Sequence, residues 1–487
     1  MNKRLTHNTW PLVIFLAAFL LRLIYLLQYR SNPSFYLPMV DELWHLEWAK
    51  DIIGGNFWGS EAYFRGPLYP YVLAAFLKIT GDSLFWVRLL QAVIGSLSAV
   101  MVYLIGRRLF VPAVGIIAAL AYAAYGTIIF YETMLLIPVL FIFLNLVAVY
   151  LLLRYQGSIS SKHWLLAGLV VGLSAIARPN ILILAPIFLV WIYLSFHAVD
   201  TRRKISLAAV FLVGTLIPVL SVTARNYMVT GEPILISSQG GVNLYIGNNP
   251  ETEGLTMLMP ELDLNESLPW TEFAEATRIA AERESGHSLT AAGESSFWTK
   301  KALVFIVSNP GKFIGITFKK LVYFLIGFEN SDQTDIYFSR TYSSLLSLLI
   351  WKSPIYFPFG LIVPLALIGM MLSWPRRREL ALLYVFIIGY IPTVILFLVT
   401  ARHRLAVIPF LLLFAAFGGI ALKDFAVKRE WRKFTGYLAL FLIALILGNR
   451  TYFDIGFENT AQIHFNLGLT YERQGDLGRA ESEYLES

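Results

Sequence analysis

Residues 36–71 read "YLPMVDELWHLEWAKDIIGGNFWGSEAYFRGPLYPY" and follow directly on an apolar run that extends to Tyr29. An apolar run of about 20 residues is long enough to cross the hydrocarbon core of a bilayer as a helix. The stretch therefore places two adjacent carboxylates, Asp41 and Glu42, where a membrane span ends. The interpretation of the chain depends on the side of the membrane where these acids lie, and on their partners there.

The composition is that of an integral membrane protein. Of 487 residues, 57% are hydrophobic and only 15% are charged, which leaves too little polar surface to cover a soluble protein of this size. The first apolar run is not interpreted as a signal peptide, because no small-residue cleavage site follows it. Cysteine is absent, which excludes disulfides and thiolate metal sites. The net charge of +7 is interpreted as a topology signal, and nucleic acid is not expected as a partner.

Apolar windows predict an all-α bundle of about eleven transmembrane helices. The predicted spans cover residues 10–29, 84–105, 112–130, 133–153, 163–177, 181–196, 205–223, 355–373, 379–399, 404–422 and 434–449. The segment 312–328 is predicted to lie in the membrane interface, because a span there would move every later basic loop to the outer side.

Basic residues orient these spans. Placing Lys3 and Arg4 in the cytoplasm leaves the other basic loops on the same side, as the positive-inside bias requires. Residues 30–83, 224–354 and 450–487 are then predicted on the outer face. The quoted stretch is thus expected at the outer, periplasmic surface of a plasma (inner) membrane.

Two domains are predicted. Residues 1–450 form the transmembrane module, with outer loops 30–83 and 224–354, and residues 451–487 form a helical hairpin. The hairpin carries Leu467, Gly468, Tyr471 and Ala480 at the spacing of a tetratricopeptide repeat. One repeat cannot bury its own apolar face, and the sequence stops inside the second helix, so either further repeats follow in the natural protein or this tail is frayed. Such repeats bind peptides or protein partners, so a protein partner is expected for the tail. An ordinary amphipathic helix pair is the alternative.

Asp41 begins an aromatic-rich helical pattern, where a carboxylate can satisfy free N–H groups and meet the positive end of the helix dipole. Capping leaves Glu42 unexplained, and it does not explain His45, which lies on the same helix face one turn later. A carboxylate at this boundary can also accept a proton from a hydroxyl. We therefore interpret Asp41 and Glu42 as candidate catalytic residues and His45 as a candidate substrate-binding residue.

Several cations fall at the outer face, where the positive-inside bias disfavours them. They are Arg65, Arg178, Arg402, His403 and Arg404. An anionic lipid headgroup would explain the group, whereas snorkelling to the surface explains each residue taken singly. Glu132 also lies at this face and is expected to turn inward toward the same place, since it would be costly against lipid.

The order of these motifs resembles a known superfamily. The motifs are an apolar first helix with Arg22, "DE" in the first outer loop, "YFRGPLYPY", "YE" opening the fourth span, "GLSAIARP", "ARNYMVTGEPILISSQGGVNLYIGNNP" and "ARHRLAVIPF". Together, over roughly residues 10–450, they are similar to the GT-C polyprenyl-phosphate-sugar glycosyltransferases. The resemblance is strongest to the protein O-mannosyltransferase branch and to its relative that adds aminoarabinose to lipid A.

By this resemblance, Asp41 matches the family's catalytic acid and Glu42 its neighbour. Arg65 lies beside the family's basic residue in the first outer loop, and Arg404 matches a basic position before the proline of the tenth span. A polar outer-loop motif whose role is unassigned matches Asn248 and Asn249. The family's chemistry is a single inverting displacement at the anomeric carbon, for which one base and cations for the departing phosphate suffice.

The resulting hypothesis is an enzyme that moves a monosaccharide from a polyprenyl-phosphate donor to an acceptor hydroxyl, on protein by analogy with the O-mannosyltransferases. Lipid A or another surface glycan is the alternative acceptor. A lipid-linked sugar transporter or flippase would show two similar halves, which the sequence lacks, and a scaffold would leave the outer acids and arginines without a purpose. No cofactor is expected, although Asp41, Glu42, His45 and Glu132 could in principle hold a divalent ion.

Overall fold

The structure is a computed structural model that describes residues 9–196, 199–255, 259–262, 270–331, 334–452 and 460–487. These residues form helices and no β-strand, apart from an isolated bridge between Trp351 and Phe357. The predicted all-α class is therefore confirmed.

Seven of the described helices are long and apolar enough to cross a membrane. They are α1 (Trp10–Tyr29), α4 (Leu84–Leu109), α7 (Pro138–Tyr155), α10 (Thr201–Thr230), α16 (Phe359–Ser373, extended by a 3₁₀ turn to Arg376), α19 (Ile408–Val427, preceded by α18, Ala401–Arg404) and α20 (Trp431–Gly448). An eighth candidate is the pair α5 (Pro112–Ala123) and α6 (Gly126–Thr133), whose axes differ by 53°.

Four further apolar segments are shorter than these spans. They are α3 (Leu68–Thr80), α8 (Ser161–Ala177), the 3₁₀ turn η2 (Pro179–Leu184) with α9 (Ala185–Leu194), and α17 (Ala381–Ile395). Every predicted span falls on one of these apolar helices or helix pairs, but α8, η2–α9 and α17 are short. The number of membrane crossings therefore stays a prediction.

The chain breaks between α6 and α7. The sequence predicted a span that starts at residue 133, but α7 begins at Pro138 and residues 134–137 are not helical. Proline suits the first turn of a helix because it lacks the N–H that would be unpaired there. This break is important because it forms one wall of the site described below.

Glycines let the helices approach closely. A Cβ on Gly168 of α8 would lie 2.0 Å from the carbonyl oxygen of Phe211 in α10, and one on Gly369 of α16 would lie 1.9 Å from that of Phe414 in α19. Small residues at such contacts allow backbone-to-backbone packing, which associates helices inside a membrane.

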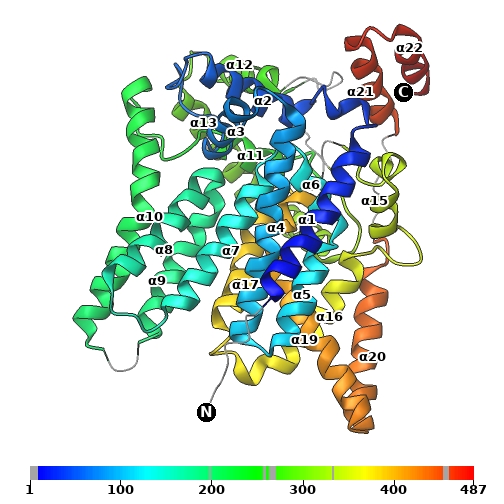
Figure 1. The fold of residues 1–487 in the computed structure, drawn as a ribbon. Helices are drawn as coiled ribbons and strands as arrows, with labels where there is room; N and C mark the ends of the chain where they lie inside the picture. The colour runs from blue at the N-terminus through cyan, green and yellow to red at the C-terminus, as the bar shows by residue number, and fades with distance from the viewer. Residues whose placement is uncertain (1–8, 197–198, 256–258, 263–269, 332–333, 453–459) are drawn as a thin grey trace.

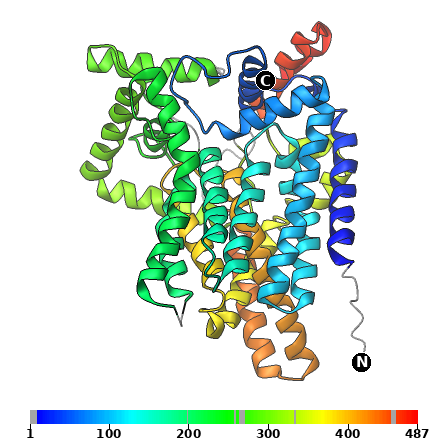
Figure 2. The same cartoon turned by 60° about the vertical axis from the view of Figure 1, so that its left-hand side comes forward.

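The remaining helices cover one end of the bundle (Figure 1, top). They are α2 (Val40–Ile53), with α3 packed against it, α11 (Gly240–Gly247), α12 (Trp270–Ser285) and α13 (Ala291–Ser308). The helix α14 (Pro310–Leu325) contacts α13 and α17, whereas α15 (Ser344–Leu349) packs lower down (Figure 1) against α1 and α6. The α19–α20 hairpin extends from the opposite end in both views (Figure 2). The chain segments predicted on the outer face thus share one end of the molecule with the quoted stretch.

The C-terminal hairpin consists of α21 (Thr460–Arg473) and α22 (Leu477–Glu486). Leu467, Tyr471 and Ala480 are buried between the two helices. Gln474 donates a hydrogen bond of 3.2 Å to the carbonyl oxygen of Pro33, so the hairpin docks beside the segment that leads into α2. A two-helix hairpin is what the sequence predicted, and its identity as a tetratricopeptide repeat remains a prediction.

Candidate active site

Asp41 lies between two arginines that come from distant parts of the chain. Its Oδ1 accepts a hydrogen bond of 2.8 Å from Arg65, and its Oδ2 accepts one of 2.6 Å from Arg402. Burial alone would raise the pKa of Asp41, but the two guanidinium groups outweigh burial and hold the pKa well below its usual range. Asp41 is therefore an ionised carboxylate held by two cations.

Capping does not account for Asp41. The N-cap position of α2 is Met39, and within the described residues no side chain bonds to the first turn of this helix as a cap. Val40, which directly precedes Asp41, has φ of +50°. A β-branched residue rarely adopts this left-handed conformation, and such strain is found most often where the surrounding structure fixes a functional group.

A close approach of two backbones assembles the cations. A Cβ on Gly66 would lie only 2.4 Å from the carbonyl oxygen of Ala177 at the end of α8. The loop that carries Arg65 therefore rests directly against the residue before Arg178. This contact requires glycine at position 66, and it brings two of the predicted arginines to the same place.

The assembled residues line a cavity of about 420 Å³. Six of the predicted site residues border it, and they are Asp41, His45, Arg65, Arg178, Arg402 and His403. The remaining lining is supplied mainly by the α6–α7 break, η2, α11 and α17. Three guanidinium groups around one carboxylate make the cavity net positive, and the planar donors of arginine suit a phosphate.

Glu42 is not among the residues that line this cavity. Its Oε2 accepts a hydrogen bond of 2.8 Å from the backbone N–H of Leu135 and lies 3.4 Å from Arg88. Burial raises the pKa of Glu42, against the opposing effect of Arg88. The geometry does not support a direct catalytic role and instead makes Glu42 a partner of the α6–α7 break.

Other buried side chains hold the same break. Gln91 donates to the carbonyl oxygens of Glu132 and Met134, at 2.9 Å each, and Arg88 donates to that of Thr133 at 3.2 Å. Sequence reasoning missed Arg88 and Gln91. The available signal was their position inside the predicted span 84–105, because polar residues within a membrane helix usually have a specific partner.

Glu132 and Arg404 lie outside the cavity lining, contrary to expectation. Glu132 is buried and paired with Arg22 at 2.6 Å, and it accepts a hydrogen bond of 2.8 Å from Tyr122. Arg404 is paired with the buried Glu329 at 2.7 Å and donates to backbone carbonyl oxygens of the loop after α14. Both residues satisfy buried charges elsewhere in the fold, so neither is placed to bind a substrate in this cavity.

Asn248 and Asn249 are also structural in this geometry. Asn248 donates to the carbonyl oxygens of Leu244 and Leu396, at 2.8 Å each. Asn249 accepts from the backbone N–H groups of Glu251 and Thr252. These bonds end α11 and join it to α17, while Oδ1 of Asn248 is buried without a hydrogen-bond partner among the described residues.

The metal alternative is not supported. Across the described part of the chain, no three His, Asp or Glu side chains are grouped so that they could hold a metal ion. Both oxygens of Asp41 face guanidinium groups, and Glu132 pairs with Arg22. The four side chains considered for a divalent ion therefore do not converge.

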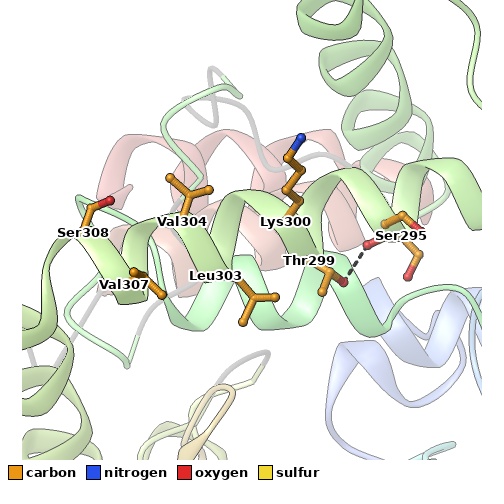
Figure 3. Close-up of a pocket in the computed structure, with 8 residues that line it drawn as sticks. Ser295, Thr299, Lys300, Leu303, Val304, Val307 and Ser308 are labelled. Carbon is orange, nitrogen blue, oxygen red and sulfur yellow. Dashed lines mark hydrogen bonds between the residues drawn. The ribbon is translucent and has the colours of Figure 1, made fainter.

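A second hollow of about 540 Å³ lies along α13 and has a different lining. Figure 3 shows its lining residues on that helix, with Thr299 donating a hydrogen bond to the carbonyl oxygen of Ser295. Lys300 is the one charged residue among its lining residues. This open groove lacks the acid and the arginine cluster that line the cavity at Asp41.

Comparisons with known proteins found similarities over part of the chain. Residues 65–224 match the family described as dolichyl-phosphate-mannose-protein mannosyltransferase. Two relatives are named undecaprenyl phosphate-α-4-amino-4-deoxy-L-arabinose arabinosyl transferase. The one from Pseudomonas aeruginosa is 30% identical over 206 residues, which cover 40% of this chain and 36% of the relative. The one from Pseudomonas paraeruginosa is 33% identical over 135 residues, which cover 26% of this chain and 23% of the relative.

A solved structure matches almost the whole chain. The apo oligosaccharyltransferase of Archaeoglobus fulgidus aligns with a TM-score of 0.51 and 15% identity, over 99% of this chain and 60% of that one. The chain has the GT-C glycosyltransferase fold. The resemblance drawn from the order of the motifs is thus confirmed at the level of the fold.

The region matched by the family model contains only part of the residues described above. Arg65, Arg178, Arg88 and Gln91 fall within residues 65–224, whereas Asp41 lies before that region and α18, with Arg402, lies far beyond it. The relatives match well under half of their own length. The activity and the substrates of the whole protein are therefore matters for proposal.

Proposed function

We propose that the protein is an inverting glycosyltransferase, which moves a monosaccharide from a polyprenyl-phosphate donor to an acceptor hydroxyl. The observation that carries this proposal is the position of Asp41 between Arg65 and Arg402 at the wall of a cavity with a third arginine. A base beside a phosphate site is what transfer from a sugar phosphate requires. The names of the matched family and of both relatives support the same reaction class.

The ion pairs of Asp41 suggest how the reaction is timed. The donor phosphate competes for Arg65 and Arg402, and each arginine that turns to the phosphate releases one oxygen of Asp41. The pKa of Asp41 then rises toward its usual value, because its depression comes from these cations. Asp41 thereby becomes a better base when the donor is in place.

The transfer itself is one displacement. The acceptor hydroxyl gives its proton to Asp41, and its oxygen forms a bond to the anomeric carbon. The bond between that carbon and the phosphate oxygen breaks, and the electron pair leaves with polyprenyl phosphate. The arginines stabilise the charge that develops on the departing phosphate. The configuration at the anomeric carbon inverts.

The acceptor that we propose is a protein hydroxyl, supported by the name of the family matched by residues 65–224. Lipid A or another surface glycan is the second candidate, favoured by the names of the two bacterial relatives. We further propose that the end of the bundle with α2 and the C-terminal hairpin faces the outside of a plasma membrane, with the hairpin open to a protein partner. The positive-inside bias of the basic loops supports this orientation.

Two measurements test the function. Purified protein in nanodiscs is incubated with polyprenyl-phosphate mannose or polyprenyl-phosphate aminoarabinose and a mixture of candidate acceptors, and release of polyprenyl phosphate is followed. Mass spectrometry then compares outer-surface proteins and lipids from cells with and without the gene. We expect gene-dependent sugar on one acceptor class. The absence of any gene-dependent sugar, together with no release from either donor, would argue against the proposal.

A further inference from the structure

His45 borders the cavity from α2, one helical turn beyond Asp41, and only 1% of it is exposed. Its Nδ1 lies 3.1 Å from the carbonyl oxygen of Leu135. A carbonyl oxygen only accepts hydrogen bonds, so Nδ1 carries the proton and Nε2 carries the lone pair. Nε2 is buried, and it has no hydrogen-bond partner among the residues that the structure describes.

Asn180 borders the same cavity from η2. Its Nδ2 donates to Oγ1 of Thr393 at 3.1 Å, and the hydroxyl of Thr393 donates to the carbonyl oxygen of Tyr390 at 2.7 Å. Because Thr393 has used its one proton, it can only accept from Asn180, which fixes the orientation of the amide. The Oδ1 of Asn180 is therefore an acceptor, and it too is buried without a partner in the described part of the chain.

Two residues of the cavity lining thus each carry a buried acceptor without a partner among the described residues, and the charged groups of the same lining are mostly donors. Arg65, Arg178 and Arg402 cannot accept hydrogen bonds. A buried acceptor without a partner is unfavourable, so its retention points to a ligand that supplies a donor. The hydroxyl groups of a sugar are such donors, and a cavity of about 420 Å³ is within the size range of small-ligand sites.

We propose that Nε2 of His45 and Oδ1 of Asn180 accept hydrogen bonds from hydroxyl groups of the donor sugar, and so recognise the sugar separately from its phosphate. This inference rests on the proposed function and deepens it. The arginines hold the phosphate, while the two acceptors select a ring that presents hydroxyl groups to them.

The electrostatics of the cavity keep His45 in the form that this role needs. Burial and the charge of Arg65 lower the pKa of His45 to about 3, against the opposing effect of Asp41, and Arg402 acts in the same direction as Arg65. The ring is therefore neutral at physiological pH. Its Nε2 keeps the lone pair that accepts a hydrogen bond.

The test separates recognition of the sugar from recognition of the lipid phosphate. Binding of polyprenyl phosphate, polyprenyl-phosphate mannose and polyprenyl-phosphate aminoarabinose is measured for the wild type, His45→Asn and Asn180→Ala in nanodiscs. Asparagine at 45 keeps a donor near the position of Nδ1 and removes the acceptor. We expect each variant to bind the preferred sugar lipid roughly 3- to 10-fold more weakly. Binding of bare polyprenyl phosphate should stay within about twofold.

A further variant distinguishes loss of sugar recognition from loss of folding. His45→Gln places an amide oxygen near the position of Nε2 and gives up the bond to Leu135, so it should keep part of the preference for the sugar lipid while its melting temperature falls. Equal weakening toward all three lipids, or no weakening in either His45→Asn or Asn180→Ala, would overturn the proposal. A wild-type protein that binds bare polyprenyl phosphate as tightly as both sugar lipids would also overturn it. A wild type that binds none of the three lipids contradicts the proposed function itself.

Discussion

At the scale of single residues, Asp41 combines two properties that mutation can separate. As a base it must accept a proton, and as an anion it competes with the phosphate for Arg65 and Arg402. We expect Asp41→Asn to lose about 10²- to 10⁴-fold in transfer rate, because an amide cannot take the proton. Binding of polyprenyl phosphate should be unchanged or tighter, since the competing carboxylate charge is gone. Near-normal turnover in a folded Asp41→Asn protein would contradict the assignment of Asp41 as the general base.

Substitution of Arg402 and of Arg404 should have different effects, although the two arginines are only two residues apart. Arg402→Ala removes a cavity cation and should weaken binding of polyprenyl phosphate, as should Arg65→Ala. Arg404→Ala instead leaves Glu329 buried and unpaired, which costs about 3–5 kcal/mol in comparable cases. The melting temperature of Arg404→Ala should therefore fall far more than that of Arg402→Ala. The double change Arg404→Ala with Glu329→Ala is the control, and it should recover part of the loss.

Glu42 provides the matching test for a positioning residue. In Glu42→Gln the amide oxygen can still accept from the N–H of Leu135, so activity should remain within about tenfold of wild type. Glu42→Ala leaves that buried N–H unpaired and should cost about 1–3 kcal/mol of stability. Unfolding of the purified variants and their kcat and KM are measured together. A loss of 10²-fold or more in a stable Glu42→Gln would restore Glu42 as a catalytic residue.

At the scale of elements, the contact between the Arg65 loop and the end of α8 depends on one glycine. A Cβ at Gly66 would lie 2.4 Å from the carbonyl oxygen of Ala177, so the loop must move. We expect Gly66→Ala to weaken phosphate binding and transfer more than tenfold, because Arg65 and Arg178 lose their common position. Gly436→Ala in α20 is the control, since nothing lies within 4 Å of its Cβ. Equal activity of the two variants would contradict this account.

The α6–α7 break shows where sequence reasoning stops. Residues 112–138 are apolar almost throughout, and their hydropathy predicted one span followed closely by the next. The backbone groups of the break are satisfied by Glu42, Arg88 and Gln91, which come from α2 and α4. A window of local sequence cannot report hydrogen bonds to residues more than 40 positions away. The same limitation hid Gln91 and Asn180 from the list of candidate residues.

At the scale of the whole molecule, composition and apolar windows were sufficient to predict the all-helical class, whereas the orientation drawn from the charge pattern stays a prediction. The apolar windows located the helices, and the cations that contradict the positive-inside bias led to Arg65, Arg178 and Arg402 around Asp41. The same argument also selected Arg404. Residues two apart on a helix face different sides, so the sequence could not tell which arginine of the pair enters the cavity. Packing decides this, because Arg404 turns to Glu329 while Arg402 turns to Asp41.

The orientation in the membrane is the last prediction, and the absence of cysteine makes it directly testable. The cavity includes both Pro138 at the start of α7 and Ala177 at the end of α8, so the turn between these helices lies at the opposite end of the bundle. Exposed positions exist at both ends. Ser60 and Ser288 lie on the cavity end, whereas Gln156 and Lys428 lie in the α7–α8 and α19–α20 turns.

Single cysteines at these four positions should divide into two pairs in intact cells. Ser60→Cys and Ser288→Cys should react with an impermeant thiol reagent, because polyprenyl-phosphate sugars would be used at the outer face. Gln156→Cys and Lys428→Cys should react only after the membrane is permeabilised, since basic residues favour the cytoplasmic side. Labelling of Lys428→Cys from outside, with Ser60→Cys protected, would show that the protein has the opposite orientation in the membrane. The cavity would then open to the cytoplasm. The acceptor could be neither a secreted protein nor a surface glycan, because neither is present on that side.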